Sequence, residues 1–280
     1  MEKIKRIKAG FPLSVGVAVL AIILIILPLS VFAQTPTALE VMEMVDERDD
    51  GDRSISDMKM LLIDRNGSRR TRSLRAFGID RGHDRYSIMF FLSPGDVKGT
   101  GFMSYDYDQA GQDDDQWLFL PALKKVKRIA SSDKSGSFMG SDFSYADLTK
   151  RRLEDYTYSF YKKRPEVVVY GNKCRVIESL PKTRDVINET GYLKSILFIR
   201  QDNHVIVRAI HYLEDSSVKY YDIKRLAHID GIWTALEIHM TRKKGKKTVH
   251  RTILTQENVA YNRESVNVSL FTTRYLEKGL

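Results

Sequence analysis

Apolar and polar side chains alternate along most of the chain after residue 54. The alternation is clearest over residues 86–92 and 232–240, where every second side chain is mainly apolar. A period of two places successive side chains on opposite faces of an extended segment, so the pattern predicts β-strands. Further strands are expected at residues 55–63, 72–80, 101–107, 116–120, 167–170, 174–180, 194–200, 205–212, 218–226 and 247–255.

The joints between these strands carry the residues that tight hairpin turns require. They are Asn66-Gly67, Gly171-Asn172, Asp202-Asn203, Asp230-Gly231 and Gly245. Such turns need a positive φ, which Gly and Asn accept at low cost, so the strands are expected to form an antiparallel meander. Ten or more strands in one domain do not stay flat. Twist should therefore curl the sheet into a barrel or a strongly bent half-barrel.

Helices are expected near both ends of the strand region. Residues 37–45 space apolar side chains at helical intervals, with Thr37 as a cap and Glu40 completing a capping box. A terminal helix is expected at residues 269–278. Its apolar side chains, which would dock on the sheet, are Leu270, Phe271 and Tyr275.

Two other segments depart from simple alternation. Residues 121–160 contain Pro, Gly and many Ser, with a short helix expected at residues 144–153. The strand at 205–212 is apolar on both faces. One of its faces must therefore meet a packed helix or a ligand instead of water.

The first 33 residues have the layout of an export signal. Four basic residues and one acidic residue lie within the first eight positions, and residues 9–33 carry no charge. We expect cleavage between Ala33 and Gln34. The alternative is an uncleaved anchor, because 25 uncharged residues exceed the roughly 20 that span a bilayer. Both interpretations place the rest of the chain outside the inner membrane, since the basic end stays in the cytoplasm.

Removal of the signal leaves residues 34–280, enough for one domain. This part holds 41 basic and 35 acidic residues, a mild net charge of +6. Because an exported chain rarely meets nucleic acid, we expect no nucleic-acid partner. Cys174 is the only cysteine, so no intramolecular disulfide can form, and we expect it to be buried on a strand.

No motif for catalysis or metal binding is found. The nearest approach to a nucleophile elbow, residues 136–140, has its serine in the wrong place. The chain lacks H-E-x-x-H and a cysteine pair, no two histidines share a helical i, i+4 spacing, and the acidic runs do not fit an EF-hand. We therefore expect no enzyme, no metal and no cofactor.

A cluster of basic residues marks one predicted hairpin. Its lysines are Lys243, Lys244, Lys246 and Lys247. They could contact anionic headgroups, at roughly 1 kcal/mol per charge, or an acidic partner surface. The alternative is a charged strand tip that prevents edge-to-edge pairing.

Two segments are more specific than any of these patterns. They are QWLFLPALKKVKRI at residues 116–129 and SFMGSDFSYADL at residues 137–148. Together they resemble the signature of the outer membrane lipoprotein-sorting protein family, the LolA-like group related to the periplasmic carrier LolA and the receptor LolB. The closing FTTRYL at residues 271–276 also fits the family. The resemblance implies an incomplete antiparallel β-barrel closed by a few short helices, with an apolar cavity for acyl chains.

Within these motifs, aromatic and aliphatic residues are the candidates for lipid binding. Trp117 and Phe119 would face one side of a strand, and Leu118 and Leu120 the other. The remaining candidates, in a Gly/Ser-rich loop, are Phe138, Met139, Phe143 and Tyr145. This loop could be a lid over a ligand cavity or a plug that fills the barrel. The expected rim residues are Lys124, Lys125, Lys127 and Arg128.

The sequence thus favours a periplasmic carrier or acceptor of lipid, lipoprotein acyl chains or a similar amphiphile. The resemblance implies an inner-membrane exporter of the resistance-nodulation-division type or an outer-membrane acceptor as partner. A monomer is expected. The alternative is an envelope scaffold that binds an exporter or envelope protein through its surface. A lipid hydrolase, the third interpretation, would need a nucleophile with a partnered base, and we identify none.

Overall fold

The computed structural model of the chain describes residues 35–109 and 111–280. The expected export signal, with its cleavage site between Ala33 and Gln34, lies outside the described residues. Residues 36–280 form one structural unit. None of the helices in the described ranges combines the length and the apolar character that crossing a membrane requires.

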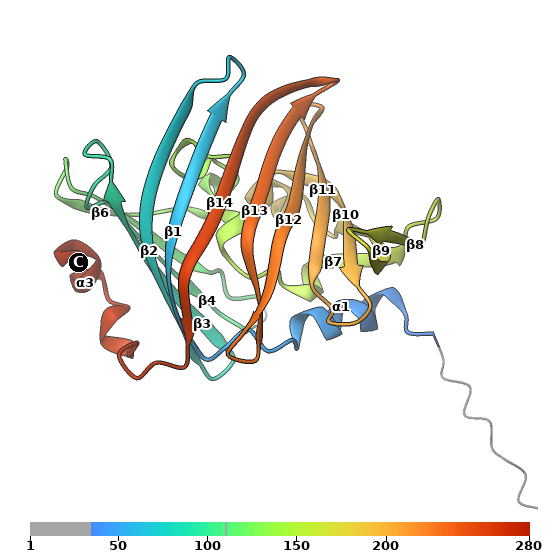
Figure 1. The fold of residues 1–280 in the computed structure, drawn as a ribbon, viewed down its shortest axis with the longest axis horizontal. Coiled ribbons are helices and arrows are strands. Elements are labelled where there is room, and N and C mark those ends of the chain that lie inside the picture. Colours follow the sequence, from blue (N-terminus) through green and yellow to red (C-terminus); the bar gives the residue numbers. More distant parts are fainter. Residues whose placement is uncertain (1–34, 110) are drawn as a thin grey trace, which may run out of the picture. The chain divides into compact units, whose positions relative to one another are not determined.

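The strands of the described chain form one fourteen-stranded antiparallel sheet (Figure 1). Its first six strands are β1 (Arg53–Asp64), β2 (Arg69–Arg81), β3 (Asp84–Ser93), β4 (Gly101–Asp106), β5 (Asp115–Leu120) and β6 (Lys125–Arg128). The others are β7 (Tyr156–Phe160), β8 (Glu166–Val169), β9 (Asn172–Pro181), β10 (Tyr192–Arg200), β11 (Ile206–Leu213), β12 (Ser217–Ile229), β13 (Ile232–Lys244) and β14 (Lys247–Tyr261).

The strand order is β6-β5-β4-β3-β2-β1-β14-β13-β12-β11-β10-β9-β7, with β8 also paired to β9. The two halves of the chain are therefore two meanders, joined where β1 pairs with β14. The end strands β6 and β7 do not pair with each other. The sheet curls without closing (Figure 1), which confirms the predicted half-barrel. The curl follows from the right-handed twist that accumulates over long neighbouring strands.

All five predicted turn positions lie at hairpins of the sheet. Two strands and one α-helix were not predicted: β6, β7 and α2 (Arg184–Thr190). β6 pairs with β5 as a hairpin. β7 pairs with β9, past the intervening β8, and this partner cannot be read from local sequence. The prediction of a helix at residues 144–153 is wrong. This stretch instead contains the 3₁₀ turn η3 (Ala146–Leu148) and the start of η4 (Leu153–Asp155).

The helix α1 (Ala38–Asp46) confirms the capping prediction. Thr37 Oγ1 accepts a hydrogen bond from the Glu40 amide at 3.2 Å, and the Glu40 carboxylate accepts one from the Thr37 amide at 2.6 Å. These two bonds satisfy amide groups that a helix start leaves without partners. The buried side chains of Val41 and Met42 then pack α1 against strands β9–β11.

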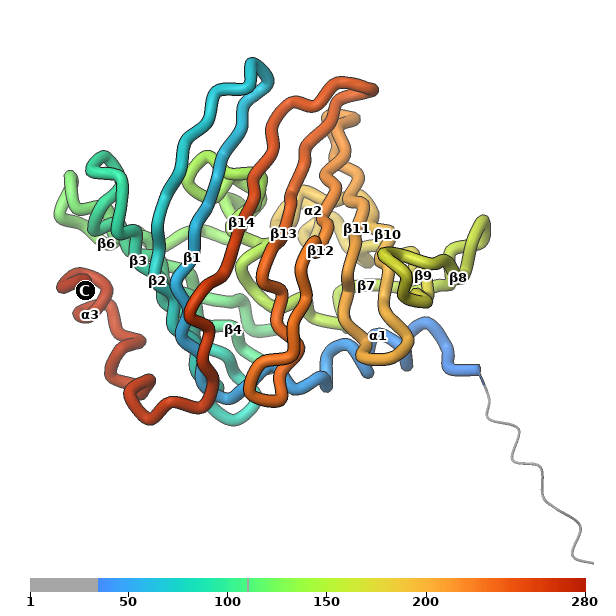
Figure 2. The backbone as a smooth tube through the Cα atoms, in the orientation of Figure 1, coloured from blue at the N-terminus to red at the C-terminus, as the bar shows by residue number. Residues whose placement is uncertain are grey.

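A long connection between β6 and β7, residues 129–155, covers one face of the sheet, which we call the inner face. Figure 2 shows this inner segment passing behind the strands. It contains η1 (Ser131–Asp133), η2 (Phe138–Gly140), η3 and η4. Asp142 fixes it to β14, because its carboxylate accepts a hydrogen bond from Thr252 Oγ1 at 2.8 Å and lies 2.6 Å from His250 Nδ1.

The chain after β14 covers the outer face of β2–β6. It contains η5 (Val268–Leu270) and the helix α3 (Thr273–Lys278), so the terminal helix begins later than predicted. Phe271 and Leu276 are buried there against Trp117 and Phe119. Leu118 instead packs with the core on the inner face. The predicted division of this strand between two faces is therefore confirmed.

Gly101 on β4 allows α3 to approach the sheet closely. A Cβ at this position would lie 2.6 Å from Leu276 Cδ1 and 3.3 Å from the Leu276 carbonyl oxygen. We expect Gly101→Val to displace α3 and to lower the free energy of unfolding by about 1–3 kcal/mol, the usual cost of overpacking. Urea denaturation measures the loss, and faster trypsin cleavage at Arg274 would report the displaced helix.

The matched control is Gly95→Val. Gly95 lies in an exposed turn with no atom within 4 Å of an added Cβ. This control should change stability by no more than about 0.5 kcal/mol. Equal effects of the two substitutions would contradict close packing of α3.

Candidate functional site

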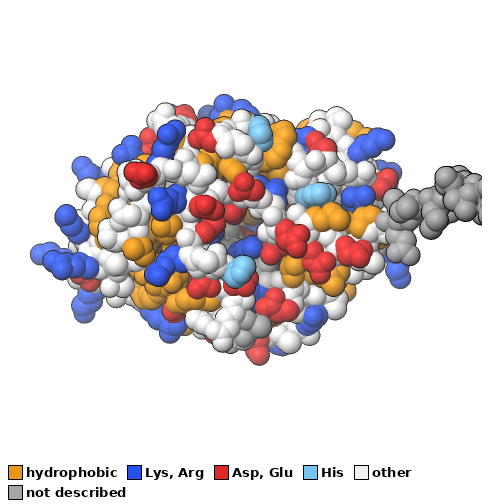
Figure 3. Space-filling model, turned by 90° about the horizontal axis from the view of Figure 1, so that it is seen from below, with side chains coloured by type: hydrophobic (Ala, Val, Ile, Leu, Met, Phe, Trp, Pro, Cys, Tyr) orange, Lys and Arg blue, Asp and Glu red, His pale blue; other side chains and the backbone are white. Residues whose placement is uncertain are grey.

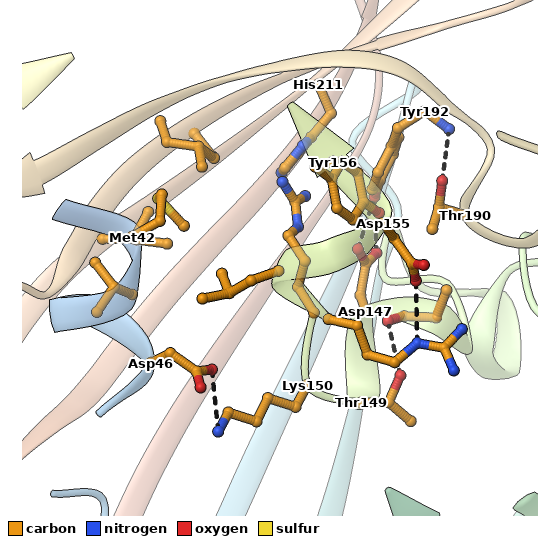
Figure 4. A pocket seen from close by; sticks show the side chains of 18 of the residues that line it. Met42, Asp46, Asp147, Thr149, Lys150, Asp155, Tyr156, Thr190, Tyr192 and His211 are labelled. Carbon is orange, nitrogen blue, oxygen red and sulfur yellow. Dashed lines mark hydrogen bonds and ion pairs between the residues drawn. The ribbon is translucent and has the colours of Figure 1, made fainter. Parts of the chain in front are cut away.

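A cavity of about 380 Å³ lies against the inner face of the sheet (Figure 4). Its walls come from α1, the end of the inner segment, α2 and strands β10–β13. Figure 4 shows Asp46 and Lys150 on one side of it, and His211 and Tyr192 on another. Residues far apart in sequence therefore build a single concave site.

The floor of the cavity contains an apolar row that runs across four neighbouring strands. Its members are Leu197, Ala209, Tyr221 and Met240. Strand register places each directly opposite the next. From α1, Met42 and Val45 line the same cavity. The row is a surface on which an apolar chain could lie out of water.

A polar row runs beside the apolar row, two residues further along each strand. Its members are Ser179, Ser195, His211 and Lys219, which are also register partners and are all buried. A hydrogen bond of 2.8 Å joins Ser195 Oγ and His211 Nδ1. The ring of Tyr192 stacks on His211, with 4.3 Å between the centroids. The inner face is thus amphipathic at this end.

Asp147 ties the inner segment to the polar row. Its carboxylate accepts hydrogen bonds from Tyr192 Oη at 2.8 and 2.9 Å and lies 3.6 Å from Lys219 Nζ. Burial alone would raise the pKa of Asp147. The positive charge of Lys219 and the hydrogen bonds from Ser144 and Tyr192 outweigh burial, so this pKa lies below its usual value. Asp147 is therefore a paired carboxylate that holds the segment against the sheet.

His211 is neutral in the folded protein. Burial, and then the nearby charge of Arg151, lower its pKa from 6.5 to about 3. The unfolded chain binds a proton at this residue below pH 6.5, whereas the folded chain does not. The free energy of unfolding therefore decreases as pH falls from 6.5 to 3. The part of this decrease that is due to His211 reaches about 2 kcal/mol at pH 5.

His211→Asn should remove this part of the pH dependence, because Asn does not titrate and can still bond Ser195. Urea denaturation at pH 7.5 and pH 5 measures the effect in both proteins. The expected result is a smaller loss of stability on acidification in the variant than in the wild type. The exposed His83 gives the control, since His83→Asn should leave the wild-type loss unchanged. Equal losses in wild type and His211→Asn would contradict burial of a neutral His211.

Three consecutive basic residues of the inner segment line the cavity: Lys150, Arg151 and Arg152. Lys150 Nζ lies 3.0 Å from Asp46 Oδ1, an ion pair between the inner segment and α1 (Figure 4). Figure 3 views the molecule from the side on which α1 lies and shows acidic and basic side chains intermixed there. Among the described residues, no group of three or more His, Cys, Asp or Glu is arranged to hold a metal ion.

Of the eight candidates for lipid binding, Phe143 lines the cavity. Trp117 and Phe119 lie on the outer face, where α3 covers them. The other five pack in the core at the opposite end of the inner face: Leu118, Leu120, Phe138, Met139 and Tyr145. Phe138 is fully buried, with its ring 5.2 Å from Phe102 and 5.6 Å from Tyr145. This part of the inner segment matches the plug alternative.

The eight basic candidates lie away from the cavity. Lys124, Lys125, Lys127 and Arg128 are exposed at β6, the end of the sheet, and Arg128 Nε donates to Asp115 at 2.8 Å. At the tip of the β13–β14 hairpin, Lys244, Lys246 and Lys247 are exposed and Lys243 is half-buried. Cys174 is buried on β9, as predicted.

Sequence reasoning missed most of the cavity lining. One signal was available, because the strand at 205–212 is apolar on both faces and supplies Ile206 and Ala209 to the cavity. The basic run at residues 150–152 was a second signal. Neither indicates which segments meet, since that depends on strand order and on the path of the inner segment.

The open half-barrel is a LolA-like fold. A family model described as an uncharacterized protein matches residues 83–278, more than half of the chain. The chain therefore belongs to this family, which the solved structures connect with the DUF1329 family and the LolA-like outer membrane lipoprotein-sorting proteins.

Three solved structures show the relationship. A DUF1329 family protein from Desulfovibrio piger is 29% identical, with a TM-score of 0.76 over 85% of this chain and 97% of its own. A domain from Vibrio parahaemolyticus, described as a putative outer membrane lipoprotein-sorting protein domain, is 28% identical, with a TM-score of 0.76 over 86% of this chain and 98% of its own. A LolA superfamily protein from Nitrosomonas europaea shares the fold at 17% identity, with a TM-score of 0.62 over 86% and 100%. None of the curated proteins compared with the chain matches it.

Proposed function

We propose that this protein is a periplasmic carrier or acceptor that shields the acyl part of a lipid, a lipoprotein or a similar amphiphile from water. The observation that carries the proposal is the cavity on the inner face of this LolA-like half-barrel, whose floor is the apolar row and whose wall includes His211 of the neighbouring polar row. A ligand that is apolar at one end and polar at the other matches both rows. The name of the similar Vibrio protein, a lipoprotein-sorting domain, agrees with this ligand class.

Binding of this kind needs no bond-making step and no cofactor. Each methylene that leaves water contributes roughly 0.8 kcal/mol, so burial of eight methylenes would supply about 6 kcal/mol before the cost of association. The volume of about 380 Å³ lies near the lower end of the roughly 300–1,000 Å³ typical of ligand cavities. This volume favours one acyl chain over several.

The export signal and the sheet surface suggest where the carrier works. Residues 1–33 would direct the chain to the periplasm, between the two membranes that exchange lipid. Its partner would be an inner-membrane exporter of the resistance-nodulation-division type or an outer-membrane acceptor. The exposed lysines of the β13–β14 hairpin are the contact that we propose for an acidic surface on such a partner.

Native mass spectrometry with lipid extraction tests the carrier function. The chain is purified from the periplasm without detergent, so that bound lipid is retained. We expect phospholipid, or another acyl-bearing molecule, at about one per chain. A chain that is empty and remains empty when offered lipid would contradict the proposal.

The exposed lysine hairpin also favours a second candidate function, a scaffold for an exporter or envelope protein. Affinity purification after crosslinking distinguishes the two functions. A scaffold should recover a protein partner that is lost when the four hairpin lysines are replaced by Gln, and it should contain no lipid. A carrier should keep its lipid in that variant.

A further inference from the structure

Arg151 differs from its two basic neighbours in what it contacts. Lys150 pairs with Asp46 and Arg152 pairs with Asp155, in each case across 3.0 Å. In the part of the chain that the structure describes, no carboxylate lies within ion-pair distance of Arg151. Arg151 nevertheless lines the cavity. Arg151 is therefore a cavity cation that no described acidic group neutralises.

Neutral groups hold the Arg151 guanidinium in place. Its Nη1 donates to Ser179 Oγ at 3.1 Å, and its Cζ lies 4.6 Å from the centroid of the Tyr156 ring. A guanidinium carries five N–H groups in a rigid plane. Because the contact with Ser179 uses one of them and the ring fixes the plane, donors remain for a ligand.

A second polar group beside Arg151 also lacks a partner. The hydroxyl of Tyr158 is buried and has no hydrogen-bond partner among the described residues. Tyr158 lies directly opposite Ser179 on the neighbouring strand. Burial raises the pKa of Tyr158, and the nearby charge of Arg151 opposes this rise. An unpaired buried hydroxyl costs about 1–3 kcal/mol, which a ligand oxygen could recover.

The other cations of this region are already satisfied. Lys219 pairs with Asp147 at 3.6 Å. Arg48, which also lines the cavity, donates to the carbonyl oxygens of Asp49 and Trp233 at 3.1 and 3.4 Å. Arg151 instead contacts neutral side chains next to an unpaired hydroxyl. This combination is what a site for an anionic oxygen group requires.

We infer that Arg151, Tyr158 and Ser179 form a subsite for a carboxylate or phosphate group on the head of a single-chain amphiphile. The inference rests on the carrier function proposed above and specifies its ligand. Arg151 would donate two parallel N–H bonds to the anion, and Tyr158 would donate its hydroxyl proton. The apolar row begins two residues away along the strands, about 7 Å, so the chain of such a ligand would extend over Leu197 and Ala209.

Paired ligands test the inference in the chain purified from the periplasm and freed of bound lipid. Hexadecanoate and hexadecanol have the same chain length, and only the first carries an anion. We expect wild type to bind hexadecanoate more tightly. Arg151→Gln should weaken hexadecanoate binding by at least about tenfold and leave hexadecanol binding unchanged, because the lost bonds are charge-assisted.

Two further variants separate binding from folding. Arg274→Gln removes the same charge from the exposed face of α3 and should change neither affinity. Tyr158→Phe should weaken hexadecanoate binding severalfold without lowering the urea midpoint, since it removes a hydroxyl that has no described partner. Isothermal titration calorimetry gives the affinities.

Three results would overturn the subsite, and they can be told apart. An equal loss of affinity for hexadecanoate and hexadecanol in Arg151→Gln would assign Arg151 a structural role. Unchanged hexadecanoate binding in that variant would reject the subsite while the carrier function stands. Wild type that binds neither amphiphile, yet binds inorganic phosphate through Arg151, would reject the carrier function and show a site for free anions.

Discussion

Replacing Ala209 by Trp is expected to weaken lipid binding by more than about tenfold while the sheet remains folded. Ala209 is buried at the centre of the apolar row, between Leu197 and Tyr221, and lines the cavity. An indole there would occupy space that we assign to the acyl chain. Loss of only two buried methylenes costs about 1.6 kcal/mol, which already exceeds a tenfold change in affinity. Titration with hexadecanoate measures the effect.

The control for this substitution is Ala122→Trp, in an exposed turn between β5 and β6. It adds the same side chain outside the cavity and should leave affinity unchanged. Circular dichroism and urea denaturation check that Ala209→Trp still folds, since overpacking typically costs about 1–3 kcal/mol. A folded Ala209→Trp variant that binds lipid as well as wild type would show that the ligand does not occupy this cavity.

Replacing Phe138 by Ala is expected to lower the free energy of unfolding by about 3–5 kcal/mol. Its ring is fully buried and packs against Phe91, Phe102 and Tyr145. Truncation of such a ring removes its burial from water and leaves a cavity that the rigid strands around it cannot fill. Urea denaturation with tryptophan fluorescence gives the change in free energy.

Leu123→Ala is the matched control for Phe138→Ala, because Leu123 is 62% exposed and lies near the same sequence motif. Its truncation should cost no more than about 0.5 kcal/mol. The folded fraction of Phe138→Ala should also keep its affinity for hexadecanoate. A small stability loss with a large loss of affinity would contradict the plug and support a lid at Phe138.

Together, these variants test whether the two parts of the inner segment have different roles. Its first part, around Phe138, fills one end of the half-barrel with side chains. Its last part supplies Phe143 and most of residues 146–155 to the cavity at the other end, while Tyr145 and Leu148 pack with the first part. The two alternatives that the sequence left open, a plug and a cavity wall, therefore describe different parts of one connection. Asp142 and Asp147 fix the boundary between them through bonds to β14 and β10.

Local patterns in the sequence determined most of the secondary structure. The period of two gave the long strands. Gly at four of the joints gave hairpins, because a single residue that accepts a positive φ sets the turn. At the β10–β11 joint, predicted from Asp202-Asn203, the residue with a positive φ is His204. Thr37 and Glu40 gave the start of α1, since the capping box needs only residues three apart. The opposite faces of Trp117 and Leu118 follow from the pleat of any strand.

Only the tertiary structure decided which of those faces meets a ligand. Trp117 and Leu118 are both apolar, and the hydrophobic effect does not specify which segment or ligand will cover each side chain. The partner of Trp117 is α3, some 150 residues later in the chain, whereas Leu118 meets the inner segment. In the same way, Tyr158 lies opposite Ser179, the partner of Arg151, because β7 pairs with β9 although β8 lies between them in the sequence. The chemistry of the cavity depends on these long-range pairings, which no local pattern encodes.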